Sequence, residues 1–242
     1  MAALAGAAAG GPLLERRIHA ALASDGRLSA RPQSVTSRID PGMHTLDVGG
    51  SRDTVLFVPQ SYRPTKPAPF ALMLHGATGS SAGPLRFSKE AAERTGMVLL
   101  VPSSTDYTWD AIRGTFGGDL ALIDRALAAA FKQVSVEPSR LAVGGFSDGA
   151  TYALSLGVIN GDLFTHAIGY SAGFIIRGAR HGRAKFFLSH GRQDQILPID
   201  QCGRRIAADL KRDGFDVHLE EFEGRHEVPP AMVDAATKWF VG

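Results

Sequence analysis

The residues best suited to covalent chemistry lie at positions 145–149, which read GFSDG. The pattern G-x-S-x-G is typical of a sharp strand-to-helix turn that presents a serine hydroxyl as a nucleophile. Glycines are required at both ends because neighbouring backbone crowds such a strained turn. The same permissive pattern also surrounds Ser81 and Ser171, so the flanking sequence must decide between the candidates.

Ser147 has the flanking elements that the turn requires. The apolar residues 141–146 predict a buried strand directly before it, and residues 150–159 are apolar on nearly every side, as expected of a central buried helix. The sequence after Ser171 shows no helical pattern and soon meets two glycines. Ser81 lies in a Gly-rich loop, where it is suited to start a helix. We therefore predict Ser147 as the nucleophile.

A serine hydroxyl needs a base to accept its proton and an acid to orient that base. Such partners follow the serine in the order acid, then histidine. Asp194 lies beyond the carboxyl end of a predicted strand, after a glycine turn, and His226 lies in the loop after the last predicted strand. Asp200 is the alternative acid, although it better suits the start of the next helix, and His190 precedes the acid. We predict Asp194 as the acid and His226 as the base.

Acyl transfer also requires two hydrogen-bond donors that face the developing oxyanion. The backbone N–H of Asp148, directly after the nucleophile, is the first candidate. The second should come from the loop after the apolar strand at 70–74, and Ala77 is our candidate there. We expect His75 in the same loop to support it by hydrogen bonding.

Segments with strand and helix patterns alternate along the chain and must position these residues. The predicted strands are 54–59, 70–74, 97–101, 141–146, 165–170, 185–189 and 217–222, and the predicted helices are 84–95, 118–131, 150–159, 200–212 and 229–240. This alternation predicts an α/β fold with a mostly parallel, doubly wound sheet and helices on both faces.

The region before the predicted sheet has a different pattern. Residues 12–24 predict a short amphipathic helix, and the polar residues 25–42 read as a linker. We therefore expect an N-terminal tail over 1–42 and a single catalytic domain over 43–242. The Ala- and Gly-rich residues 1–11 lack a basic segment, so cytoplasmic location is the default expectation, and export with a trimmed signal is the alternative.

Composition excludes several classes of function. The 242 residues carry a formal charge of +2 and are 44% hydrophobic and 21% charged, as in a soluble globular protein. No basic run indicates a nucleic-acid partner, and no stretch reaches the ~20 apolar residues of a membrane span. Cys202 is the only cysteine, which excludes an internal disulfide and a Cys-rich metal site. We expect no metal and no cofactor, and the oligomeric state stays open.

Taken together, these motifs resemble those of the α/β-hydrolase superfamily. The similarity is greatest to the small esterases grouped with polyhydroxybutyrate depolymerases, feruloyl esterases and phospholipase/carboxylesterases. The matching pieces are LHG at 74–76, GFSDG at 145–149, HG at 190–191 with Asp194, and GRHE at 224–227. The resemblance implies a serine esterase that needs no cofactor and forms an acyl-enzyme. The substrate would be a small-molecule or polymeric ester, with short-chain, hydroxyacyl, polyester or feruloyl esters as candidates. A peptidase or amidase with the same residues, or a catalytically silent binding module, are the alternatives.

Three residues are candidates for contact with the substrate. Only about a dozen residues separate the strands that end at Tyr170 and begin at Lys185, too few for a helical cap, so the site should be open. Trp109 would lie beside the acyl or alcohol pocket, or else pack in the core. Arg177 belongs to a basic segment that either contacts an anionic substrate group or is a solvated loop. His75 is the third candidate, from the oxyanion loop.

Overall fold

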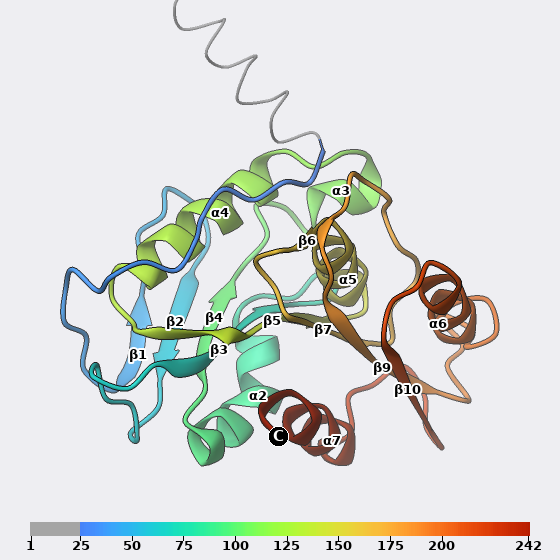
Figure 1. Ribbon diagram of the computed structural model, residues 1–242. Helices are drawn as coiled ribbons and strands as arrows, with labels where there is room; N and C mark the ends of the chain where they lie inside the picture. The colour runs from blue at the N-terminus through green and yellow to red at the C-terminus, as the bar shows by residue number, and fades with distance from the viewer. Residues whose placement is uncertain (1–24) are drawn as a thin grey trace, which may run out of the picture.

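An eight-stranded, mostly parallel sheet forms the centre of the protein (Figure 1). The computed structural model describes residues 25–242. The strand order is β1-β2-β4-β3-β5-β7-β9-β10, in which the pairs β1–β2 and β2–β4 are antiparallel and the other neighbours are parallel. The strands of this sheet are β1 (Gly42–Thr45), β2 (Thr54–Val58), β3 (Ala68–Leu74), β4 (Val98–Pro102), β5 (Val136–Phe146), β7 (His166–Tyr170), β9 (Lys185–Gly191) and β10 (Val217–Phe222). A separate short ladder pairs β6 (Asn160–Gly161) with β8 (His181–Gly182).

Helices cover both faces of the sheet (Figure 1). One face carries α2 (Ala82–Thr95) and α7 (Pro230–Val241), and their apolar side chains pack with one of the two hydrophobic clusters. The other face carries α3 (Asp110–Arg113), α4 (Gly118–Phe131), α5 (Asp148–Ile159) and α6 (Gly203–Arg212), whose side chains pack in the larger cluster. Two covered faces explain why the central strands read as continuous apolar runs.

The predicted α/β architecture is confirmed, and each strand and helix predicted beyond residue 43 has its counterpart. The short elements β1, α3, β6 and β8 were not expected from the sequence. The segment between β7 and β9 contains only the two-residue β8, so the protein has no helical cap at that position. The helix predicted over residues 12–24 lies outside the described residues. Within the described part of the chain, no helix has the length and apolar character needed to cross a membrane.

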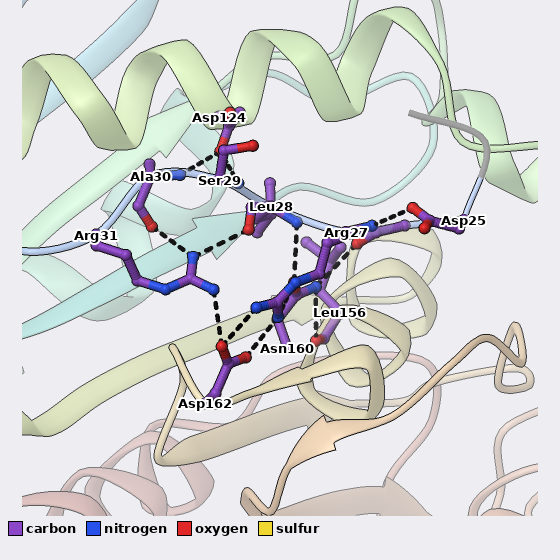
Figure 2. Close-up of polar contacts among 11 residues, drawn as sticks. Asp25, Arg27, Leu28, Ser29, Ala30, Arg31, Asp124, Leu156, Asn160 and Asp162 are labelled. Atoms are coloured by element: carbon purple, nitrogen blue, oxygen red, sulfur yellow. Dashed lines mark hydrogen bonds and ion pairs between the residues drawn. The ribbon is translucent and has the colours of Figure 1, made fainter. Parts of the chain in front are cut away.

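The segment from residue 25 to residue 41 differs from the expected linker, because it packs against the helices α4 and α5 on one face of the domain. Leu28 and Ile39 are buried in the larger hydrophobic cluster. Asp124 on α4 accepts hydrogen bonds from the backbone N–H groups of Ser29 and Ala30, each at 2.8 Å (Figure 2). Residues 25–41 therefore share one hydrophobic core with the domain that was predicted to begin at Met43.

Asn160, at the end of α5, is the main anchor of this segment (Figure 2). Its side chain is fully buried; the amide oxygen accepts from the Leu28 N–H at 2.9 Å, and the amide nitrogen donates to the Gly26 carbonyl at 2.9 Å. Arg27 forms a bidentate ion pair with Asp162, and its hydrogen bond holds the pKa of that carboxyl well below the ordinary value. Short apolar and polar contacts thus replace regular secondary structure here.

Replacing the anchor should measure how strongly residues 25–41 contribute to folding. We expect Asn160→Ala to lower the free energy of unfolding by about 3 kcal/mol, because the buried Leu28 N–H and Gly26 carbonyl would lose their partners. Urea denaturation of the full chain measures this change. Glu90→Gln, at an exposed position of α2, is the control and should leave the midpoint unchanged. An unchanged midpoint in Asn160→Ala would mean that the segment does not contribute to stability.

Candidate active site

Ser147 stands at the turn between β5 and α5 in a strained backbone conformation. Its φ is 56° and its ψ is −120°, outside the regions that most non-glycine residues occupy. The Ser147 N–H donates to the Tyr170 carbonyl at 2.9 Å, which ties the turn to β7. A side chain at Gly149 would collide with the carbonyl groups of Leu74 and His75, and one at Gly145 would lie 2.5 Å from the Gly149 carbonyl carbon. The tight contact with β3 therefore requires both glycines.

His226 connects Ser147 to Asp194 through its two ring nitrogens. Its Nε2 lies 2.9 Å from Ser147 Oγ, and its Nδ1 lies 2.7 Å from Asp194 Oδ2. An ionised carboxylate can only accept, so Nδ1 carries the proton and Nε2 is free to accept from the serine hydroxyl. The imidazole also packs on the Phe146 ring, with 4.8 Å between ring centroids. This arrangement prepares the hydroxyl for deprotonation.

Asp194 is buried but well supplied with donors. The N–H groups of Ile196 and Leu197 donate to Oδ1 at 2.9 Å and 2.8 Å. Burial alone would raise the pKa of the Asp194 carboxyl, but the hydrogen bonds from Leu197 and His226 outweigh it and hold that pKa below its ordinary value. The acid therefore stays ionised at neutral pH and keeps the imidazole in the required tautomer.

A second histidine, His190, also contacts Asp194. Its Nε2 lies 2.7 Å from the Leu197 carbonyl and 3.3 Å from Asp194 Oδ2, and the side chain is almost fully buried. Because a carbonyl can only accept, Nε2 carries the proton and is shared between the two oxygens. Burial lowers the pKa of His190, which favours its neutral form. His190 thus places one more N–H near Asp194 Oδ2, the oxygen that His226 also contacts.

The loop after β3 lies directly against the nucleophile. A side chain at Gly76 would come within 3.2 Å of Ser147 Cβ. Both ring nitrogens of His75 are engaged: Nδ1 lies 2.7 Å from the Gly76 carbonyl, and Nε2 accepts from the Ser104 N–H at 2.9 Å. Trp109 Nε1 donates to the His75 carbonyl at 2.8 Å. Buried hydrogen bonds thus fix the loop that carries Ala77.

Two side chains connect the neighbouring loop, residues 103–109, to the β3 loop and to the start of α5. The Arg52 guanidinium donates to the carbonyl groups of Gly79, Ser104 and Asp106 at 2.5 Å, 3.1 Å and 3.0 Å. Thr108 Oγ1 donates to Asp148 Oδ2 at 2.5 Å, next to the first turn of α5. These bonds join three loops at the carboxyl ends of the parallel strands, where ligands bind in such sheets.

A cavity of about 390 Å³ opens beside His226. It lies between the β3 loop, the start of α2 and the loop before α7, and its apolar wall contains Ala77, Pro84, Phe87 and Val228. The first residue of α5, Asp148, has no intrahelical acceptor for its N–H. An ester carbonyl oxygen bound between Ser147 and this loop could accept a hydrogen bond from such a free N–H group.

The structure brings together some of the predicted residues and separates others. Ser147, Asp194 and His226 form one hydrogen-bonded chain, whereas the hydroxyl of Ser171 is buried and has no hydrogen-bond partner among residues 25–242. Ala77 and His75 line the cavity beside His226.

Two of the substrate-side candidates lie away from the cavity beside His226. Trp109 is fully buried and packs in the core, so it does not line this cavity. Its indole supports the β3 loop instead. Arg177 lies at a different cavity, where it pairs with Asp213 at 3.1 Å. Within residues 25–242, no group of three or more His, Cys, Asp or Glu side chains could hold a metal ion.

The supporting roles of His190 and Arg52 were not predicted from the sequence. His190 was visible as the residue before the glycine turn that leads to Asp194, a spacing that places it at the end of the same strand. Arg52 gave no signal, because it lies in a loop far along the chain from the three carbonyl groups that it contacts.

Solved structures with this fold include several ester hydrolases. The fluorophosphonate-binding serine hydrolase FphF of Staphylococcus aureus superposes with a TM-score of 0.69 at 15% identity, covering 84% of this chain and 100% of that one. The acetyl xylan esterase of Aspergillus awamori has a TM-score of 0.68 at 17% identity, covering 83% and 99%. The ferulic acid esterase AmCE1/Fae1A of Anaeromyces mucronatus, solved with ferulic acid, has a TM-score of 0.61 at 14% identity, covering 89% and 96%. At such identities the likeness concerns the fold.

Sequence comparison gives the family. No curated protein sequence matched the chain. A sequence profile described as phospholipase/carboxylesterase matches residues 113–240, which is more than half of the chain and contains the serine turn, Asp194 and His226. The chain therefore belongs to the phospholipase/carboxylesterase family and is a carboxylic-ester hydrolase with the α/β-hydrolase fold.

Proposed function

We propose that this hydrolase cleaves carboxylic esters through an acyl-enzyme on Ser147, with His226 as base and Asp194 as the orienting acid. The observation that carries the proposal is the unbroken hydrogen-bonded chain from Ser147 Oγ through both nitrogens of His226 to Asp194. No other serine of the three G-x-S-x-G matches has a histidine as hydrogen-bond partner among residues 25–242.

In the first half of the reaction, Ser147 Oγ attacks the ester carbonyl carbon while its proton passes to His226 Nε2. The backbone N–H groups of Ala77 and Asp148 stabilise the negative charge on the carbonyl oxygen. When the tetrahedral intermediate collapses, the ester C–O bond breaks and Nε2–H gives its proton to the leaving alcohol. Asp194 stabilises the imidazolium that exists between these two transfers.

In the second half, water takes the place of the alcohol. His226 removes a proton from this water as the oxygen attacks the acyl carbon, and the proton then returns to Ser147 Oγ as the carboxylic acid leaves. The same donors stabilise the second tetrahedral intermediate. Every proton is carried by His226, so the cycle needs no further group.

The cavity beside His226 suits a small ester group. A volume of about 390 Å³ with an apolar wall accommodates a short acyl chain or one aromatic ring. Since the segment between β7 and β9 forms no helical cap, one end of a polymeric ester could also reach Ser147. We therefore propose short-chain and hydroxyacyl esters as substrates, with polyester or feruloyl esters as extended versions, and no nucleic-acid partner. We further propose that residues 25–41 belong to the single catalytic unit with the rest.

Serine replacement tests the assignment of the nucleophile. Ser147→Ala should lower kcat for p-nitrophenyl acetate at least ~10⁴-fold, because no other hydroxyl within residues 25–242 bonds to His226. Ser171→Ala is the matched control, since it removes a hydroxyl from the same pattern at the next strand and should retain most activity. Steady-state hydrolysis measures both. Full activity in Ser147→Ala, or its loss only in Ser171→Ala, would contradict the proposal.

The pH dependence tests the base and its support. Asp194, with its lowered pKa, stays ionised as the pH falls below neutral, so loss of activity on the acidic side should follow protonation of a histidine. We expect kcat/KM to rise between about pH 6 and pH 8 and then level off. A profile that is flat across this range would contradict base catalysis by His226 in the rate-limiting step.

The same profile tests His190 as a positioning residue for Asp194. His190→Leu should lower kcat about tenfold, the equivalent of one charge-assisted hydrogen bond of about 1.5 kcal/mol. Its acidic limb should move to higher pH, because a carboxylate with fewer donors holds the imidazolium proton more strongly. His190→Gln keeps an N–H donor and should restore most of the activity. Equal profiles in both variants and the unmodified protein would exclude this role.

A further inference from the structure

A second cavity, of about 350 Å³, lies between α6 and the segment that follows β7. We call it the α6 cavity. Its apolar wall includes Val158, Ile175 and Leu210, and its charged side chains include Arg177, Arg180 and Arg205. The cavity is distinct from the one beside His226, with which it shares no lining residue.

One end of the α6 cavity is connected to the serine turn by two hydrogen bonds through Thr151. Gly173 lines that end, and its N–H donates to Thr151 Oγ1 at 3.0 Å. The Thr151 N–H in turn donates to the Ser147 carbonyl at 3.0 Å. Val158 lies almost two turns further along α5, about 10 Å away at the rise of an α-helix. The cavity therefore runs along α5, and the buried Thr151 separates its Gly173 end from the serine turn.

The lining of the α6 cavity carries more positive than negative charge. Three arginines and two aspartates line it. Asp213 already binds Arg177 at 3.1 Å and Arg180 at 2.6 Å, and Asp209 binds Arg212 at 2.6 Å. Within residues 25–242, Arg205 forms no ion pair. One guanidinium thus faces the cavity without a carboxylate, and two others share one.

Apolar side chains continue from the cavity toward the site. Phe174 lines the cavity and is 46% exposed, and Ile196, next to Asp194, is 71% exposed. Leu197 lies beside Gly173, where a Cβ would stand 3.4 Å from its side chain. An apolar chain could lie along this surface, and its far end would meet the arginines. A guanidinium binds a carboxylate through two parallel hydrogen bonds.

We propose that the α6 cavity binds the far end of the substrate, and that the preferred esters carry a carboxylate at the end of an apolar chain. Arg205 binds this carboxylate, and Arg177 adds to the field at the same position. The proposal rests on ester hydrolysis at Ser147 and narrows its substrate class to anionic esters. Arg205 is a specificity residue, since it lies away from the reacting atoms.

Two matched pairs of esters test the proposal at neutral pH. The first pair is mono-p-nitrophenyl suberate and its methyl-capped analogue, which place the charge on the acyl side. The second pair is the acetate ester of ω-hydroxyhexanoate and the corresponding amide, which place it on the alcohol side. In at least one pair, we expect kcat/KM to be about tenfold higher for the anionic member, with a preference that declines as salt is added.

Arginine variants connect that preference to the cavity. Arg205→Gln should bring the ratio close to one, and Arg177→Gln should reduce it in part. Arg140→Gln is the control, because this exposed arginine lies in the half of β5 away from Ser147. All three variants should hydrolyse p-nitrophenyl acetate as the unmodified protein does.

Two results would overturn the proposal while leaving ester hydrolysis intact. One is equal kcat/KM for both members of both pairs, and the other is a preference that survives Arg205→Gln. A protein that fails to hydrolyse p-nitrophenyl acetate would instead contradict the function on which the proposal rests.

Discussion

The close contact between the serine turn and the end of β3 constrains the rest of the site. Ser147 holds a left-handed φ because Gly145 and Gly149 let the turn approach the carbonyl groups of Leu74 and His75. Such a conformation persists only when its surroundings determine it. Here the turn is held by the buried strand β5 before it and the buried helix α5 after it. The hydroxyl is consequently presented at the carboxyl end of the central strand β5, next to the first turn of α5.

Around this turn, hydrogen bonds between loops fix the backbone, whereas elsewhere in the protein regular secondary structure does so. The β3 loop is fixed by His75, Trp109 and Arg52, which bind backbone carbonyl and amide groups. In the loop that follows β9, Asp194 is held by two backbone N–H groups of the same loop and by His190. Hydrogen bonds within the chain therefore hold the functional groups of both loops in place. The buried His75 and His190 thus bind the backbone of these loops, whereas His226 bonds to Ser147.

The sequence was informative where local pattern and fold coincide. The apolar runs before and after Ser147 identify the turn because both elements are buried on all sides, and the order of Asp194 and His226 follows from parallel strands that end at one edge. The sequence was uninformative where long-range packing decides. Nothing local distinguishes a Trp109 that lines a pocket from one that supports a loop. Residues 25–41 read as a linker because their order comes from Asn160 and Asp124, far along the chain.

The central claim is that Ser147 is the residue that becomes acylated. A fluorophosphonate forms a stable covalent bond with an activated serine, and mass spectrometry of the intact protein followed by peptide mapping locates it. We expect a single adduct per chain, on Ser147, and none on the Ser147→Ala variant. An adduct on Ser171 or Ser81, or equal labelling of the variant, would contradict the claim.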